Sequence, residues 1–124
     1  MPTLKRCRRL VRRHPIPEGA AATVEFVHPG PNGPRHGRSL VDVSVSGLSF
    51  DAGPELAGIG SGTTIPGAVV RFGGCEMRGE LLVMHETACT PERRTIGALF
   101  YPAQDVDLVK WKSVVAGVEA VQTT

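Results

Sequence analysis

Residues 42–50 read Asp-Val-Ser-Val-Ser-Gly-Leu-Ser-Phe, and they place a D-x-S-x-x-G pattern at the end of an apolar strand. Arg38–Ser44 has the apolar content of a strand, residues 45–47 interrupt it, and Leu48–Ala52 continues as a second strand. An Asp-x-Ser at a strand end is typical of a turn whose side chains bond the local backbone. Gly47 allows a positive φ and a close approach of the backbone to a ligand.

Short apolar segments separated by turn residues continue on both sides of this stretch. Gly73-Gly74 predicts a two-residue hairpin of type I′, in which both central residues have positive φ. From Gln104 the apolar spacing fits a helix, with Asp105 and Asp107 in its first turn. This order predicts a mainly β chain, folded as a small antiparallel barrel or sandwich with a C-terminal helix packed across it. The six predicted strands are Ala20–His28, Arg38–Ser44, Leu48–Ala52, Ile65–Phe72, Cys75–Met84 and Arg93–Tyr101, with loops at Pro29–Gly37, Gly53–Thr64 and His85–Glu92.

The amino-terminal segment is strongly basic. Six of the 14 Lys and Arg residues of this 124-residue chain fall in its first 13 positions, where there is no acidic residue. The rest of the chain has a formal charge of −4, although the whole chain has +2. Pro15 and Pro17 exclude a helix at the end of this segment. We therefore expect residues 1–19 to be a flexible basic arm and residues 20–122 to be a single barrel domain with its helix.

Composition and processing signals exclude several classes of protein. Hydrophobic residues make up 41% and charged residues 21%, which is typical of a folded domain. The basic start is not followed by the apolar run of a signal peptide, and no apolar stretch is long enough to span a membrane, so we expect a cytoplasmic protein with no membrane insertion. Cys7, Cys75 and Cys89 are odd in number and widely spaced, which does not fit a disulfide framework. His85 with Cys89 lacks a paired Cys-x-x-Cys, so no metal is expected.

Signatures of catalysis are missing from the sequence. It contains no phosphate-binding loop of the G-x-x-x-x-G-K-[ST] type, no H-E-x-x-H and no G-x-S-x-G. Residues 58–62 lack the third spaced glycine and the following helix of a dinucleotide fingerprint. We therefore expect a protein that is not an enzyme and has no cofactor. The four histidines, His14, His28, His36 and His85, are interpreted as surface or loop residues, and Trp111 as a packing residue.

Two motifs together carry more information than either does alone. The arm contains the spacing R-x-x-x-R twice, and the D-x-S-x-x-G pattern follows it. In this order they resemble the PilZ domain, a family of bacterial receptors for cyclic di-GMP. The resemblance covers nearly the whole chain and implies a six-stranded antiparallel split β-barrel with a C-terminal α-helix. The residues that carry it are Arg8, Arg9, Arg12, Arg13, Asp42, Ser44, Gly47, the I-G-x-x-F strand Ile96–Phe100 and a helix over 103–120.

The chemistry of these residues fits a cyclic dinucleotide, which has two phosphate charges and two guanines. A guanidinium group forks onto phosphate oxygens or onto guanine O6 and N7, and it stacks on a purine face. A carboxylate accepts from the guanine N1–H or N2–H₂, and a hydroxyl group donates or accepts. The arm would be mobile when empty and ordered when filled. The predicted ligand-binding residues are Arg8, Arg9, Arg12, Arg13, Asp42, Ser44 and Gly47.

The register of the arginine motif affects the expected stoichiometry. Arg13 lies nearer the barrel and so has the shorter reach to Asp42, which favours Arg9 and Arg13 over Arg8 and Arg12 as the main contacts. Arg8 then directly precedes the motif, and the resemblance implies that a basic residue there goes with an intercalated ligand dimer.

The resemblance also implies an output. It predicts a receptor that relays the messenger to an unknown effector protein in motility or biofilm signalling. One alternative is an adaptor of the same fold that does not bind the nucleotide. The other is a small β-barrel that binds nucleic acid through its basic arm. Nucleic acid is not expected as a partner, because the sequence has only one Trp, one Tyr and four Phe, which are too few for the exposed platform on which bases would stack.

Overall fold

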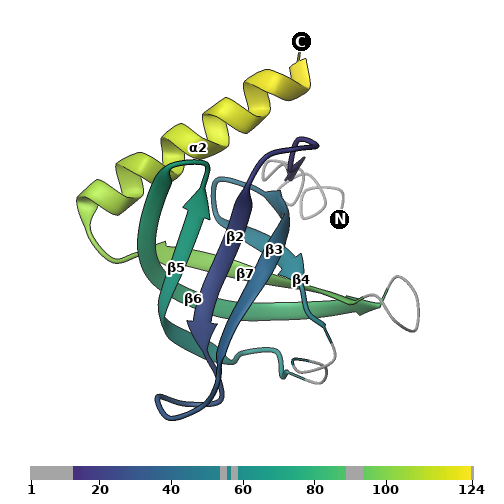
Figure 1. The fold of residues 1–124 in the computed structure, drawn as a ribbon, viewed down its shortest axis with the longest axis vertical. Coiled ribbons are helices and arrows are strands. Elements are labelled where there is room, and N and C mark those ends of the chain that lie inside the picture. The colour runs from purple at the N-terminus through teal and green to yellow at the C-terminus, as the bar shows by residue number, and fades with distance from the viewer. Residues whose placement is uncertain (1–12, 54–55, 57–58, 89–93, 124) are drawn as a thin grey trace, which may run out of the picture.

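The computed structural model describes residues 13–53, 56, 59–88 and 94–123 (Figure 1). This part of the chain contains seven strands and one α-helix. In chain order they are β1 (His14–Pro15), β2 (Ala22–Val27), β3 (Arg35–Val43), β4 (Gly47–Asp51), β5 (Thr64–Phe72), β6 (Cys75–Ala88), β7 (Arg94–Pro102) and α2 (Asp105–Thr123).

Six of the strands close into a barrel. They pair antiparallel in the order β3-β2-β5-β6-β7-β4, and β4 pairs again with β3. The expected six-stranded antiparallel barrel is therefore confirmed, and the sandwich is excluded. β1 is an extra strand, whose His14 and Pro15 pair with Val43 and Asp42 of β3. β4 pairs with one edge of β3, so β1 lies on the opposite edge of β3, which it shares with β2.

Side chains that alternate along the strands fill the barrel. In β2, Val24 and Phe26 point inward and are buried, while the residues between them are partly exposed. Phe26 packs on Phe50 of β4, with ring centroids 5.5 Å apart. The largest fully buried side chains are Trp111, Phe26, Phe50, Leu56, Ile65, Met77, Leu81, Ile96, Val24, Val43, Val70 and Val83.

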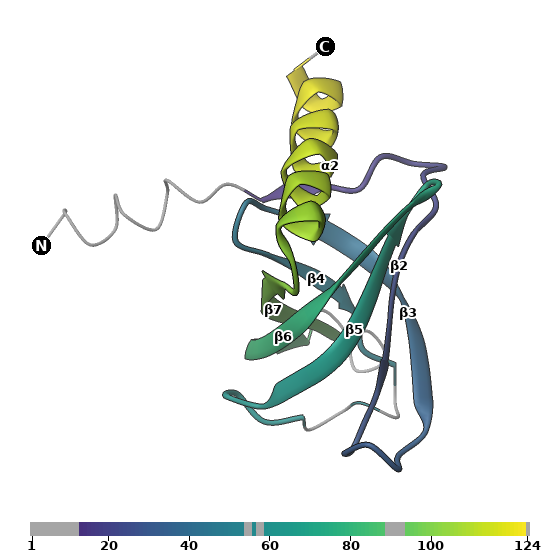
Figure 2. The ribbon, with the colours of Figure 1, turned by 90° about the vertical axis from the view of Figure 1, so that its left-hand side faces the viewer.

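Helix α2 lies across one end of the barrel (Figure 2). Trp111 is 1% exposed and meets Phe100 of β7 edge-on at 5.0 Å, so its predicted packing role is confirmed. Asp107 accepts hydrogen bonds from the backbone N–H groups of Gln104 and Arg78, at 3.2 and 2.9 Å, and so caps the helix and fixes it to β6. In the part of the chain that the structure describes, no helix is long and apolar enough to cross a lipid bilayer.

Several predicted boundaries were wrong. β3 begins at Arg35 and not at Arg38. β6 continues to Ala88, through residues that were predicted to be loop, because pairing with β7 stabilises a segment too polar to indicate a strand. Strands β5 and β6 do form the predicted hairpin, but of its two glycines only Gly73 has a positive φ, of 61°. The turn therefore has the type II′ pattern and not type I′.

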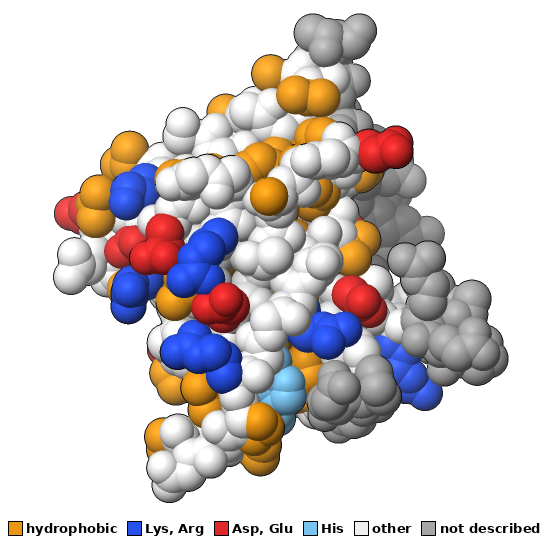
Figure 3. Space-filling model, in the orientation of Figure 1, with side chains coloured by type: hydrophobic (Ala, Val, Ile, Leu, Met, Phe, Trp, Pro, Cys, Tyr) orange, Lys and Arg blue, Asp and Glu red, His pale blue; other side chains and the backbone are white. Residues whose placement is uncertain are grey.

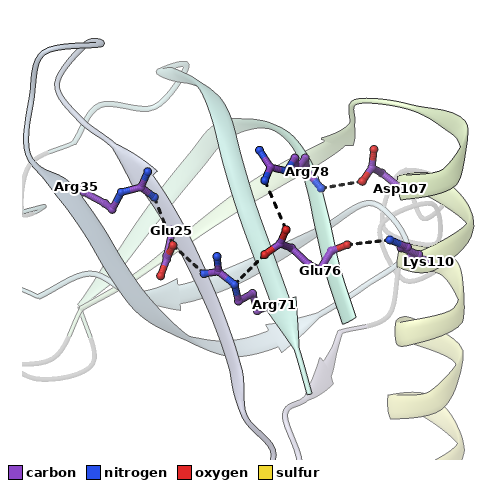
Figure 4. A network of polar contacts seen from close by, with 7 residues as sticks. All are labelled: Glu25, Arg35, Arg71, Glu76, Arg78, Asp107 and Lys110. Carbon is purple, nitrogen blue, oxygen red and sulfur yellow. Dashed lines mark hydrogen bonds and ion pairs between the residues drawn. The ribbon is translucent and has the colours of Figure 1, made fainter. Parts of the chain in front are cut away.

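Charged side chains form a network on the outer face of β2, β3, β5 and β6 (Figures 3 and 4). Arg71 bonds Glu25 at 2.7 Å and Glu76 at 3.0 Å, and Arg35 adds a longer contact to Glu25 at 3.3 Å. The hydrogen bond from Arg71, with the nearby positive charge of Arg71 and Arg35, lowers the pKa of Glu25. The same hydrogen bond raises the pKa of Arg71. These pairs are exposed, so the network fixes side-chain positions more than it stabilises the fold.

Candidate functional site

Asp42 faces outward because β3 contains a β-bulge. The pairing of β3 with β4 shifts its register between Leu40 and Asp42, which leaves one extra residue on β3. Leu40 is buried, so unbroken alternation would also turn Asp42 toward the core. The bulge instead puts Val41 and Asp42 on the outer face and returns Val43 to the core, where it is 0% exposed.

The turn at residues 44–47 is held by its own serine. Ser44 is buried, its N–H donates to the Gly47 carbonyl at 2.8 Å, and its hydroxyl accepts from the Gly47 N–H at 3.1 Å. The expected local turn is therefore present. The expected positive φ at Gly47 is wrong, because Gly47 is not among the glycines with that conformation. Glycine is needed there because a Cβ would overlap the backbone carbonyl of Ala98 on β7.

Two longer contacts fix the tip of this turn. The N–H of Phe100 on β7 donates to the Ser46 carbonyl at 3.0 Å. The indole N–H of Trp111 on α2 donates to the Val45 carbonyl at 3.2 Å. The turn is thus attached both to the barrel and to the helix that covers the barrel end, while the Val45 side chain stays 58% exposed.

Arg13, the last arginine of the basic arm, meets a histidine on the barrel. Its Nη2 donates to Nε2 of His85 across 3.0 Å. A second bulge, between Val83 and His85 in β6, brings Met84 and His85 to the outer face together. Gly97 of β7 lies opposite His85, and a Cβ at position 97 would overlap the imidazole ring.

His85 was missed as a site residue in the sequence, because a polar segment after an apolar strand favoured a loop. The structure places it in β6 and beside the arm. The signal for it was Gly97 in the predicted I-G-x-x-F strand, since an isolated glycine in a strand indicates a close approach by another group. Of the other histidines, His36 is also not a surface residue: it is 9% exposed in β3, bonds the His28 carbonyl at 2.9 Å and packs on Phe26.

Four predicted ligand-binding residues come together in one hollow. Arg13, Asp42, Ser44 and Gly47 line it, with Met84 and Gly97 among the residues beside them. Its volume is about 70 Å³, far below the ~300–1,000 Å³ of a pocket that encloses a small-molecule ligand. Arg8, Arg9 and Arg12 lie outside the described residues.

The hollow combines a cationic donor with an anionic acceptor. Arg13 presents guanidinium N–H groups beyond the one that His85 uses, and they suit the oxygens of a phosphate or a guanine edge. Among the described residues, nothing pairs with the carboxylate of Asp42. No group of three His, Cys, Asp or Glu side chains within 13–53, 56, 59–88 and 94–123 is placed to hold a metal ion. Cys75 is a half-buried free thiol, and Cys7 and Cys89 lie outside the described residues.

Comparisons with known proteins give a match of fold. No family model matches the sequence, and no curated protein matches it significantly. The complex of K. pneumonia MrkH with c-di-GMP matches with a TM-score of 0.78 at 16% identity, over 92% of this chain and 54% of that chain. MrkH in its apo state matches with a TM-score of 0.73 at 19% identity, over 94% of this chain and 51% of that chain. The PilZ domain of YcgR from Escherichia coli with c-di-GMP matches with a TM-score of 0.71 at 12% identity, over 93% of this chain and 94% of that chain.

The protein is a small closed β-barrel module whose end is covered by a C-terminal helix, with Arg13 beside a polar turn. Its particular fold is that of the PilZ domain, since it matches the YcgR PilZ domain over almost the full length of both chains. The chain spans about half the length of the MrkH structures. The fold implied by the resemblance is thus confirmed.

Proposed function

We propose that this chain is a non-catalytic receptor for cyclic di-GMP. One observation carries the proposal: Arg13 of the basic arm and Asp42 of the bulge line one hollow, on a fold whose neighbours MrkH and YcgR were solved with c-di-GMP. The two R-x-x-x-R spacings and the D-x-S-x-x-G pattern support the same conclusion.

The proposed contacts follow from the donors and acceptors of each side. Arg13 forks onto a phosphate or onto O6 and N7 of a guanine. Asp42 accepts from guanine N1–H and N2–H₂, which adenine does not offer. Ser44 holds the turn through the bonds described above and also lines the hollow. Arg8, Arg9 and Arg12 add positive charge from the arm, in keeping with a ligand that has two phosphates.

The proposed output passes from the arm to the surface around α2. His14, next to Arg13, is 3.8 Å from Glu119 of α2, and the turn at residues 44–47 is bonded to Trp111 of the same helix. Ligand that orders the arm would change what this surface presents to an effector protein in the cytoplasm. The class of signalling proposed is the control of motility or biofilm.

The proposed stoichiometry is two intercalated ligands, because Arg8 precedes the Arg9/Arg13 pair. Calorimetry on the full chain tests it directly. Wild type should bind two molecules of cyclic di-GMP per chain, and Arg8→Ala should bind one. Equal stoichiometry in the two proteins would reject the role of Arg8 and leave the receptor itself intact.

The receptor proposal is tested by calorimetry with cyclic di-GMP and with cyclic di-AMP. Arg13→Ala and Asp42→Ala should each weaken binding of cyclic di-GMP about tenfold or more, since each removes hydrogen bonds to a charged group. Arg78→Ala is the matched control, because that side chain is 69% exposed in the network of Figure 4. Folded protein that gives no heat at high micromolar ligand would contradict the proposal. Equal affinity for both dinucleotides, with a steep dependence on salt, would favour the nucleic-acid alternative.

A further inference from the structure

The contact between Arg13 and His85 assigns a role to a residue outside both sequence motifs. We propose that His85 is a positioning residue, which accepts a hydrogen bond from Arg13 and holds the guanidinium over the hollow before ligand arrives. This role of His85 rests on the proposed function, in which the ligand is cyclic di-GMP.

Three features of the barrel place His85 for this contact. The bulge in β6 turns it to the outer face, and Gly97 leaves room for the ring to lie across β7. The backbone around the bulge is itself held, since the hydroxyl of Ser61 donates to the Met84 carbonyl at 2.8 Å. The imidazole is therefore mounted on strands, whereas Arg13 lies on the arm, before β1 begins at His14.

The contact needs a neutral imidazole. Arg13 can only donate, so His85 must accept through Nε2 and carry its proton on Nδ1. Protonated His85 has no acceptor and places a second positive charge beside the guanidinium. Among the described residues, the charged groups around this contact are Arg13 itself and Asp42, which lines the same hollow as Arg13; β7 contributes the uncharged Gly97. Glu86 alternates to the other face of β6 and pairs there with Arg94 at 3.6 Å.

The contact should strengthen binding by pre-organising the arm. His85 uses one N–H of Arg13, and the remaining donors stay available to a phosphate or a guanine. A side chain that is already held loses less freedom when the ligand binds. Without His85 we expect binding about three- to tenfold weaker, which matches the usual effect of ordering one long side chain. Acidification should weaken binding further, because the protonated ring repels Arg13.

The ligand-free contact is tested by ¹⁵N NMR of the histidine rings in the full chain. At neutral pH, His85 should be the Nδ1–H tautomer in wild type, and Arg13→Ala should shift it toward the other tautomer. Arg78→Ala should leave the ring signals unchanged. A tautomer that does not respond to Arg13→Ala would overturn the proposal, whether or not cyclic di-GMP binds.

Calorimetry with cyclic di-GMP between about pH 5.5 and pH 8 tests the effect on binding. His85→Phe keeps the ring size without an acceptor, and should bind three- to tenfold more weakly at pH 8. His85→Gln keeps a neutral acceptor, and should restore affinity to within about twofold while losing the extra weakening at low pH. Identical affinities and pH profiles in all three proteins would overturn the proposal. Wild type that binds no cyclic di-GMP would reject the receptor function, and the NMR result would still decide the contact.

Discussion

The indole N–H of Trp111 bonds the carbonyl oxygen of Val45 across 3.2 Å, which joins helix α2 to the turn that borders the hollow. The rest of the Trp111 ring is buried against Phe100. The turn and the helix are therefore linked directly by one buried side chain and one hydrogen bond.

Trp111 should report ligand binding by its fluorescence. It is the one tryptophan of the chain, and its N–H partner lies in the turn at residues 44–47. Cyclic di-GMP should change the emission of wild type, with saturation at the concentration found by calorimetry. The variant Trp111→Phe, which has no tryptophan, gives the background emission. Unchanged emission in protein that calorimetry shows to be saturated would mean that the turn does not respond to the ligand.

Two glycine substitutions should have opposite effects on stability. In Gly47→Ala, the new Cβ meets the Ala98 carbonyl and strands β4 and β7 must separate, so we expect a loss of about 1–3 kcal/mol in the free energy of unfolding. Gly117→Ala is the counterpart, because position 117 is exposed in α2 with open space around it. It should stabilise by about 0.5–1 kcal/mol. Urea unfolding followed by circular dichroism measures both, and a stable Gly47→Ala protein would contradict the packing described for β4.

The two aspartates of the first turn of α2 should differ in importance. Asp107 is 9% exposed and accepts from two backbone N–H groups, so Asp107→Ala should lower the free energy of unfolding by about 2 kcal/mol. Asp105 is exposed and interacts with the helix dipole, so Asp105→Ala should lose less than about 1 kcal/mol. Thermal unfolding of the two variants compares them directly. Equal losses would show that Asp107 contributes charge alone.

The Glu25–Arg71 pair predicts a dependence of stability on pH. The pKa of Glu25 is lowered in the folded protein by the hydrogen bond from Arg71, so its contribution is present above the unfolded pKa and is lost as pH falls through the folded pKa. Wild type should exceed Glu25→Gln in melting temperature at pH 7, and the gap should close below about pH 4. A gap that persists at about pH 2.5 would show that packing, and not charge, causes the difference.

The fold was predictable because its local signals agree with one another. Apolar strands, a Gly-Gly hairpin and a helical spacing that begins near Gln104 all indicated an antiparallel barrel or sandwich covered by a helix, and the resemblance to the PilZ domain favoured the barrel. Gly47 was identified for the wrong physical reason, since its role comes from β7, a strand distant in sequence. Contacts of that kind depend on tertiary pairing, which no local pattern encodes.

The candidate site was predictable only in part. Asp42 and Arg13 were found through their motifs, and the structure brings them to one hollow. His85 was not found, because its position depends on a bulge at Met84 and on the strand that passes beside it. The pairing of His14 and Pro15 with β3 was also not predicted, since the alternating prolines indicated only extended chain.

Because of the bulges in β3 and β6, the site requires a fixed number of residues in each of these two strands. Deleting one residue between Leu40 and Val43 of β3, or between Val83 and His85 of β6, would rotate every following side chain of that strand to the opposite face. Many substitutions in the same segments would leave the faces as they are. Proteins that share this site can therefore diverge widely in residue identity while the number of residues from bulge to turn stays fixed, so an alignment of them is better anchored on spacing than on similarity.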